Sequence, residues 1–116
     1  IGAPTSAELL ADVTAHALRA AMHDPQLAGI YHCVAGGETN WHAYACFVLE
    51  QARQLGWALK CGPENVAPIA TASYPTPARR PLNSRLSIHK LQAAFNLQLP
   101  HWQVHASRML QEITPQ

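Results

Sequence analysis

Apolar residues recur at intervals of three and four near the start of the chain, which is the spacing that places them on one face of an α-helix. The stripe consists of Leu10, Val13, Ala17, Leu18 and Ala21. Just before it, Thr5 and Glu8 have the spacing of a capping box, in which each side chain accepts a hydrogen bond from the backbone of the other residue. Asp24 followed by Pro25 disfavours further helix, so we expect the first helix to end near His23.

Three further stretches have the same helical period. We expect the second helix to have Thr39 as its N-cap and to end at Gly56, because glycine favours the left-handed conformation at helix ends. Ser87 is expected to cap a short third helix, and the last helix is expected over residues 102–113. The apolar positions are Trp41, Tyr44, Ala45, Val48, Leu49, Ala52 and Leu55 in the second helix, Leu91, Ala94 and Phe95 in the third, and Trp102, Ala106, Met109, Leu110 and Ile113 in the last.

Two short runs are more typical of β-strands than of helices. Residues 29–35 are rich in strand-forming side chains and precede the tight turn expected at Gly36-Gly37. Residues 66–69 contain a proline and predict at most a brief edge strand. We therefore expect an α/β fold that is helix-rich, with about four helices and one or two short strands. So few strands cannot form a complete sheet, so we expect the chain to pack against a sheet of another domain.

The composition is that of one small domain. The chain has 116 residues, of which 48% are apolar, so we expect residues 1–116 to form a single domain with a modest core. No apolar run is long enough for a membrane span, and residues 1–4 include neither an initiator Met nor a signal-like stretch, so we expect a piece of a longer protein. Cys33, Cys46 and Cys61 fit neither a disulfide framework nor a zinc ribbon, which favours buried thiols in a reducing cytoplasm.

The formal net charge of +1 conceals an uneven distribution along the chain. Residues 1–64 have a net charge of −3, whereas residues 65–111 contain five cations and no acid. Residues 62–85, which overlap this basic part, contain five of the nine prolines. Proline excludes regular helix and stiffens the backbone, so we expect an ordered loop with a function.

Three arginines of this loop, Arg79, Arg80 and Arg85, are the main candidate site. Guanidinium groups bind phosphate oxygens in a bidentate manner, and the neighbouring prolines limit the entropy lost on binding. The three side chains could therefore form an anion clamp. Two alternatives remain open at this point: a solvated basic loop, or pairing of the arginines with acids of the first half of the chain.

Other candidate sites have weaker support. Gly36-Gly37 could offer free amides to an anion, but no phosphate-binding fingerprint is present, and a tight turn explains the pair more simply. His101 and His105 could share a helix face as metal ligands, although no third ligand has a recognisable spacing. Trp41 is expected to pack in the core rather than to stack on a base or a sugar. Nucleophile motifs are missing, and Cys46 is within an apolar helix, where a thiolate is unfavourable.

Several motifs, taken in order, resemble the C-terminal part of the dTDP-4-dehydrorhamnose reductase family. The most specific is Tyr74-Pro75-Thr76-Pro77-Ala78-Arg79-Arg80-Pro81, which is continued by Asn83-Ser84-Arg85-Leu86. The others are Gly2-Ala3-Pro4-Thr5, Gly29-Ile30-Tyr31-His32, Val34-Ala35-Gly36-Gly37, Trp41-His42, Lys90-Leu91, Leu99-Pro100-x-Trp102 and Arg108-Met109-Leu110. Together they cover nearly the whole chain.

The resemblance implies a bacterial enzyme of the extended short-chain dehydrogenase/reductase group. Such an enzyme reduces the 4-keto group of dTDP-4-dehydro-L-rhamnose to dTDP-L-rhamnose with NADPH or NADH. Its N-terminal Rossmann domain binds the cofactor and contains a Tyr-x-x-x-Lys pair, while the smaller C-terminal domain binds the nucleotide sugar. This chain has no Tyr-x-x-x-Lys and no glycine fingerprint. We therefore expect it to be inactive without its Rossmann domain, which would be its main partner.

The resemblance also assigns site residues. Arg80 is expected to approach the diphosphate, with Arg79, Asn83, Arg85 and Tyr74 as supporting substrate-binding residues. Glu8 and Glu112 match positions at which some family members hold a divalent metal, such as Mg²⁺, at the contact of a homodimer. From the residues alone, surface charge on helices is the simpler explanation of both carboxylates, and the capping box already accounts for Glu8.

Two other classes of protein remain as alternatives. A non-catalytic regulatory subunit of the same superfamily would keep the fold and lack the Tyr-Lys pair in the whole protein. A small nucleic-acid-binding module could use the basic half and Trp102. The six acids within residues 1–64 and the lack of interleaved exposed aromatic residues disfavour that module, so we expect no nucleic-acid partner and no membrane partner.

Overall fold

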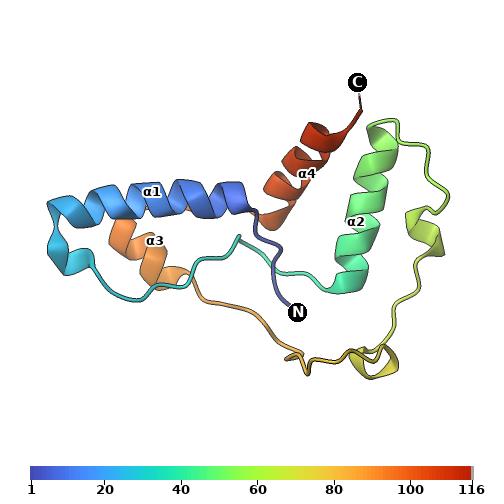
Figure 1. Ribbon diagram of the computed structural model, residues 1–116, viewed down its shortest axis with the longest axis horizontal. Coiled ribbons are helices and arrows are strands. Elements are labelled where there is room, and N and C mark those ends of the chain that lie inside the picture. Colours follow the sequence, from blue (N-terminus) through green and yellow to red (C-terminus); the bar gives the residue numbers. More distant parts are fainter. Residues whose placement is uncertain (116) are drawn as a thin grey trace.

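The computed structural model describes residues 1–115, which form four α-helices joined by long connections (Figure 1). The helices are α1 (Ala7–His23), α2 (Trp41–Gln54), α3 (His89–Phe95) and α4 (Trp102–Ile113), and the short 3₁₀ turns are η1 (Pro25–Leu27), η2 (Pro63–Asn65) and η3 (Thr71–Ser73). The predicted four helices are thus confirmed. Within the described residues, no helix is both long and apolar enough to cross a membrane.

The start of α1 differs from the predicted capping box. Ser6 is the N-cap, and its Oγ accepts a hydrogen bond from the Leu9 amide at 3.0 Å. Thr5 has a tertiary role instead, because its Oγ1 accepts from the Ala35 amide at 3.0 Å and so fastens the helix start to a distant segment. The predicted end of the helix at His23 is confirmed.

The caps of α2 and α3 are each displaced by one residue from the prediction. Asn40, rather than Thr39, caps α2, and its Oδ1 accepts from the Ala43 amide at 2.8 Å. Gly56 follows the end of α2 with a φ of 89°, as expected for a glycine at a helix end. Ile88 occupies the N-cap position of α3, while the Ser87 Oγ accepts from the His89 amide at 3.5 Å.

Both predicted strands are absent from the described part of the chain. Residues 29–35 and 66–69 are irregular, and β-pairing is limited to isolated bridges between Gly2 and Thr39 and between Gly36 and His101. The α/β class is therefore not confirmed, and the described chain is helical. The physical reason is that a strand needs a neighbour for its backbone hydrogen bonds, and neither run has one here.

The core lies where α1, α3 and α4 meet the segment that contains Ala35. Its buried members are Leu9, Val13, Ala35, Leu91, Phe95, Leu99, Trp102 and Ala106. The helix α2 joins this core through the rings of Tyr44 and Phe47, whose centroids lie 5.8 and 5.0 Å from the Trp102 ring.

The predicted core faces of α1 and α4 were only partly right. Leu9 and Val13 are the buried residues of α1, whereas Leu10 and Leu18 are exposed. In α4, Trp102, Ala106 and Leu110 are buried, while Met109 and Ile113 are exposed. The described chain measures 52 × 39 × 22 Å, so it is flat, and a flat molecule cannot bury two sides of each helix.

Candidate functional site

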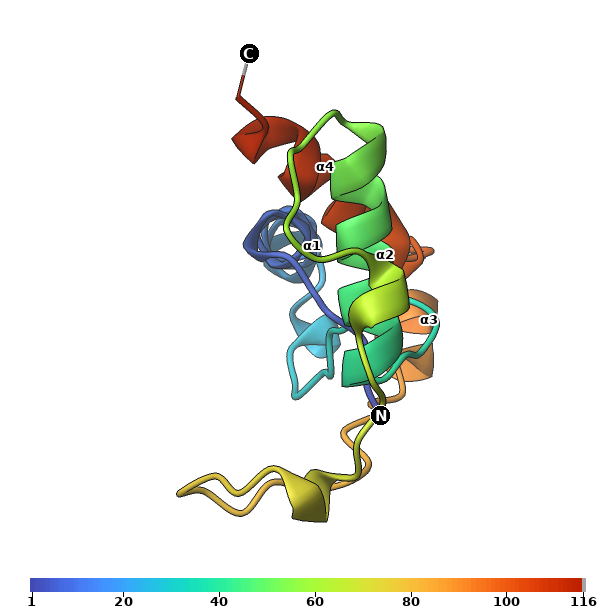
Figure 2. The same cartoon turned by 90° about the vertical axis from the view of Figure 1, so that its right-hand side faces the viewer.

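The basic loop, which we define as residues 66–85, extends away from the helices at one end of the molecule (Figure 2). Its only regular element is η3, a single 3₁₀ turn, so the predicted absence of α-helix is confirmed. Both views show the loop beyond the N-terminal end of α2 (Figures 1 and 2). Almost every residue of the loop is exposed to solvent.

The beginning of the basic loop is tied to α2. His42, in the first turn of α2, lies with Nε2 at 2.9 Å from the backbone oxygen of Val66. A carbonyl oxygen can only accept, so Nε2 is the protonated nitrogen of this imidazole. Just before the loop, Arg53 at the other end of α2 donates to both carboxylate oxygens of Glu64, at 3.1 and 2.9 Å. These contacts fix the direction in which the chain leaves η2.

The Arg53–Glu64 pair shifts the protonation of both partners. The pKa of the Glu64 carboxyl lies below its usual value because the carboxylate accepts a backbone hydrogen bond of its own residue and then one from Arg53. The hydrogen bond and charge of Glu64 raise the pKa of the Arg53 guanidinium. Both side chains are exposed, so this pair contributes little stability and serves mainly to orient the chain.

The end of the basic loop is held by the first two residues of the chain. The Ile1 nitrogen donates to the Leu82 oxygen at 2.7 Å, and the Ser84 amide donates to the Ile1 oxygen at 2.6 Å. Gly2 then exchanges two backbone hydrogen bonds with Thr39, at 3.0 and 2.7 Å. Residues 1–2 thus connect the loop to the segment before α2, and both ends of the loop are anchored around the same helix terminus.

Arg85 is the arginine of the basic loop that pairs with an acid. Its NH1 donates to Glu38 Oε2 at 3.1 Å, and its Nε donates to Asn83 Oδ1 at 2.9 Å. The Asn83 oxygen also accepts from the Arg85 backbone amide at 3.1 Å. Arg85 therefore follows the alternative in which a loop arginine pairs with an acid of the first half of the chain. Asn83 orients this side chain at the base of the loop.

Arg79 and Arg80 lie farther out on the basic loop, and both are exposed. No ion pair formed within residues 1–115 involves either guanidinium. Just before them, the Thr76 hydroxyl donates to the Ala78 oxygen at 2.8 Å and closes a local turn. Tyr74 is also exposed, at 67%. Within residues 1–115, two guanidinium groups without an acidic partner and an exposed phenol thus lie on a loop with fixed ends, which is suited to binding an anion.

The Gly36-Gly37 turn is engaged by contacts within the chain. The Gly36 amide donates to the Pro100 oxygen at 2.8 Å, so it is already used within the chain. Gly37 has a φ of 77°, and a Cβ at this position would collide with the His101 ring. The His101 ring therefore fills the space in front of the turn, and the simple explanation of a tight turn is the correct one.

The paired histidines do not form a metal site within the described residues. His101 caps α4 by accepting from the Gln103 amide at 3.3 Å, and His105 Nδ1 lies 3.1 Å from the Ser6 hydroxyl. No cluster of three or more His, Cys, Asp or Glu residues that could hold a metal ion occurs in the part of the chain described here.

Glu8 and Glu112 both form ion pairs with the same arginine, Arg108. Arg108 NH2 lies 2.9 Å from Glu8 Oε1, and Arg108 Nε lies 3.7 Å from Glu112 Oε1. The guanidinium thus neutralises the two carboxylates that the resemblance assigns to a metal. Two carboxylates paired with an arginine do not fit a divalent cation by themselves, so the Mg²⁺ site would need further ligands and stays a prediction.

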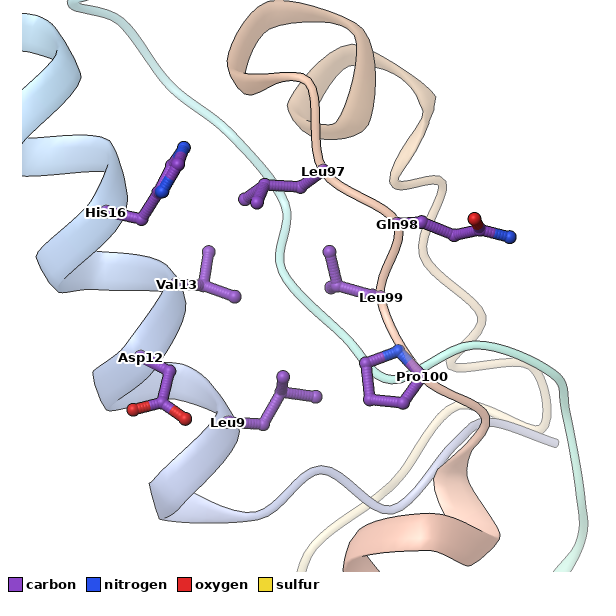
Figure 3. A pocket seen from close by; sticks show the side chains of 8 residues that line it. All are labelled: Leu9, Asp12, Val13, His16, Leu97, Gln98, Leu99 and Pro100. Carbon is purple, nitrogen blue, oxygen red and sulfur yellow. The ribbon is translucent and has the colours of Figure 1, made fainter.

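A shallow groove of about 240 Å³ separates α1 from residues 97–100 (Figure 3). Leu9, Val13 and Leu99 form its apolar floor, and all three belong to the core. Asp12 and His16 line it from α1, and Gln98 points away from it (Figure 3). The groove contains no basic residue of the loop, so it is separate from the candidate anion site.

The contacts that anchor the basic loop could not be predicted from the sequence. His42, Glu38 and residues 1–2 each hold one end of the loop, and no local pattern marks them as positioning groups. Trp41 was expected in the core, yet 79% of it is exposed. The helical period could not predict the exposure of Trp41. A segment that packs on the later turns of a helix need not extend over its first turn.

The described structure is thus a helix-rich domain that presents an anchored basic loop. The family model described as the RmlD substrate binding domain matches residues 1–114, and the chain belongs to this family.

Several bacterial relatives of the chain share one name, dTDP-4-dehydrorhamnose reductase. A dTDP-4-dehydrorhamnose reductase of Shigella flexneri is 57% identical over 112 residues, which are 97% of this chain and 37% of the relative. The corresponding protein of Escherichia coli strain K12 is 55% identical, with the same coverage. A dTDP-4-dehydrorhamnose reductase of Burkholderia thailandensis is 37% identical over 99% of this chain and 40% of its own length. The chain spans well under half of these relatives.

Proposed function

We propose that this chain is the nucleotide-sugar-binding domain, residues 1–116, of a dTDP-4-dehydrorhamnose reductase. The observation on which the proposal rests is the basic loop, which is anchored at both ends and presents Arg79 and Arg80 without acidic partners among the described residues. Anchoring matters because a pre-ordered loop loses little conformational entropy when a ligand binds. The relatives named above act on a dTDP-linked sugar according to their names, and the diphosphate of such a sugar is the expected anion.

In this proposal the domain contributes to catalysis by positioning. Arg80, supported by Arg79, neutralises the diphosphate, while Asn83 and Arg85 maintain the base of the loop and Tyr74 borders the sugar. Binding energy from the diphosphate then holds the 4-keto carbon in a fixed place, and such positioning can supply several kcal/mol of the rate enhancement.

NADPH or NADH supplies the hydride in this reaction, and the residues present here do not fit that cofactor. The chain has no glycine fingerprint and no Tyr-x-x-x-Lys pair. The proposal therefore assigns the cofactor and the proton donor to an N-terminal Rossmann domain, and it predicts no activity for residues 1–116 alone. Exposed apolar side chains such as Ile30 and Leu82 are suited to contact that domain.

We also propose that the protein is located in a bacterial cytoplasm. The relatives are bacterial proteins, and all three cysteines of this chain are free thiols, which fits a reducing bacterial cytoplasm. A homodimer remains part of the proposal, with the face that includes Glu8 and Glu112 as its contact.

An Arg80→Ala variant of the intact protein tests this function. We expect the KM for dTDP-4-dehydrorhamnose to rise by about tenfold or more, because a charge-assisted contact worth about 1.5–3 kcal/mol is lost. The KM for NADPH should stay within about twofold. Arg19→Ala on α1 is the matched control, since Arg19 is exposed and distant from the loop in sequence. An unchanged KM for the sugar would overturn the assignment of Arg80.

Binding of dTDP and turnover of the nucleotide sugar, both measured on the intact wild-type protein, separate the enzyme from the alternative of a non-catalytic subunit. An intact wild-type protein that binds dTDP and does not reduce the sugar would favour the regulatory subunit. An intact protein that turns over the nucleotide sugar with NADPH or NADH would exclude it.

A further inference from the structure

Trp41 is the first residue of α2, and 79% of it is exposed to solvent. Tryptophan side chains are mostly buried in folded proteins, because the indole has a large apolar surface. The other two indoles follow this rule here, since Trp102 is only 4% exposed and Trp57 is half-buried. An indole left in water at a defined position therefore needs an explanation.

The ring of Trp41 is held in place although it is exposed. It packs edge-to-face on Tyr44, with ring centroids 6.2 Å apart and an interplanar angle of 65°. Tyr44 packs in turn on Trp102, at 5.8 Å and 71°. A row of three aromatic rings thus runs from the core to the surface and ends in an indole that is largely exposed. A ring supported in this way can accept a flat ligand with little further ordering.

Trp41 lies beside the base of the basic loop. Thr39, two residues before it, pairs with Gly2, and the preceding Glu38 binds Arg85 at 3.1 Å. The next residue after Trp41 is His42, which holds the Val66 oxygen at the other end of the loop. Both views place the loop beyond this end of α2 (Figures 1 and 2). The exposed ring and the arginines therefore share one end of the molecule.

We propose that Trp41 is the stacking platform for the pyrimidine base of the nucleotide sugar. This inference rests on the proposed function, which supplies the nucleotide. A nucleoside diphosphate has two parts that a protein can hold separately: a flat base, which stacks on aromatic rings, and a charged diphosphate, which binds arginine. The chain offers one structure of each kind at the same end of α2. Trp41 would thus set the affinity for the base, and the basic loop that for the diphosphate.

The alternative explanation is that another part of the intact protein covers Trp41 as an ordinary packing contact. Loss of the indole would then reduce stability and would weaken all ligands equally. A platform for the base has a different signature, because only ligands that contain a base should depend on it. The two explanations can therefore be separated by comparing a ligand with a base and a ligand without one.

The experiment measures binding of dTDP and of inorganic pyrophosphate to the intact protein by calorimetry. For Trp41→Ala we expect dTDP to bind about tenfold more weakly, since stacking on one base is worth about 1–3 kcal/mol. Pyrophosphate binding should stay within about twofold. Trp41→Phe keeps an aromatic face and should recover dTDP binding to within about threefold. Arg80→Ala, in contrast, should weaken both ligands.

Tryptophan fluorescence provides a second readout on the same proteins. Bound dTDP should quench the wild-type emission, and the quenching should disappear in Trp41→Phe. It should persist in Trp57→Phe, the matched control, because the Trp57 Nε1 is bonded to the Thr114 hydroxyl at the far end of α2. Unchanged dTDP affinity in Trp41→Ala would overturn the inference, and so would an equal loss for both ligands. A wild-type protein that does not bind dTDP would overturn the proposed function itself.

Discussion

His42 and Val66 are joined by a hydrogen bond of 2.9 Å between an imidazole nitrogen in the first turn of α2 and the backbone oxygen that opens the basic loop. Together with the pairing of residues 1–2, this bond makes the terminus of one helix the support for both ends of the loop. The position of the arginines therefore depends on residues that do not themselves contact an anion.

The first prediction concerns this support. His42→Ala should increase the mobility of the basic loop, raise the KM for the nucleotide sugar about threefold to tenfold, and leave kcat nearly unchanged. Loss of one such hydrogen bond should also lower the free energy of unfolding by about 1 kcal/mol. Steady-state kinetics and urea unfolding of the intact protein would measure the two effects.

His23→Ala is the matched control for His42→Ala. The hydrogen bond of the His23 ring in the described chain is with the Arg19 oxygen of its own helix, at 2.9 Å, and His23 lies at the opposite end of α1 from the N-terminal residues. We expect no change in KM for this variant. An equal rise in KM for both variants would show that the loop does not depend on the His42 contact.

The second prediction concerns the glycines with positive φ. Gly37→Ala and Gly56→Ala both place a Cβ in a left-handed conformation, which costs about 1 kcal/mol. Only at Gly37 would the new Cβ also collide with the His101 ring, whereas nothing lies within 4 Å of a Cβ at Gly56. Gly37→Ala should therefore lower the free energy of unfolding by about 1–3 kcal/mol more than Gly56→Ala.

A double-mutant cycle tests the cause of that difference. With His101→Ala in the background, the cost of Gly37→Ala should fall to that of Gly56→Ala, because the obstructing ring is gone. Denaturant unfolding of the four proteins of the cycle and of Gly56→Ala gives the required free energies. Equal costs for the two glycine variants in the wild-type background would show that the His101 ring yields freely.

The third prediction is a pH dependence of thiol reactivity. Burial raises the pKa of the Cys33 thiol above its usual value, because desolvation disfavours the thiolate. At any pH below that pKa, Cys33 has a smaller thiolate fraction than an ordinary cysteine, whereas Cys61 is exposed. Iodoacetamide should therefore label Cys61 first at pH 8, with Cys33 approaching it only as the pH rises further.

Mass spectrometry of the labelled peptides would follow both residues in one experiment. A Cys61→Ser variant should lose the fast phase and keep the slow one. Faster labelling of Cys33 than of Cys61 at pH 8 would contradict the burial seen for Cys33.

The helices could be predicted from the sequence because their signals are local. The end of α1 at His23 and the extent of α4 follow from proline, capping and the helical period, and all lie within a few residues of the elements they define. Local signals could not predict whether residues 29–35 and 66–69 would form strands, and both runs are irregular. A strand depends on a partner elsewhere, and the same side chains remain irregular when no partner is present.

The basic loop could also be located from the sequence, whereas the state of each arginine could not. Prolines and arginines within residues 74–85 indicated an ordered anion-binding loop, and the resemblance of that motif indicated the family to which the chain belongs. Nothing local distinguished Arg85, which Glu38 neutralises, from Arg79 and Arg80. That difference comes from residues 47 positions apart and exists only in the folded chain.

The amino-acid sequence by itself determined where the four helices lie, that three arginines belong to one proline-rich loop, and which family the chain resembles. Only the tertiary structure decided that both ends of this loop meet the start of α2, that Arg108 joins Glu8 to Glu112, and that Trp41 faces solvent. The physical reason is that period, caps and charge are properties of neighbouring residues. Anchoring, neutralisation and exposure depend instead on which distant segments the hydrophobic core brings together.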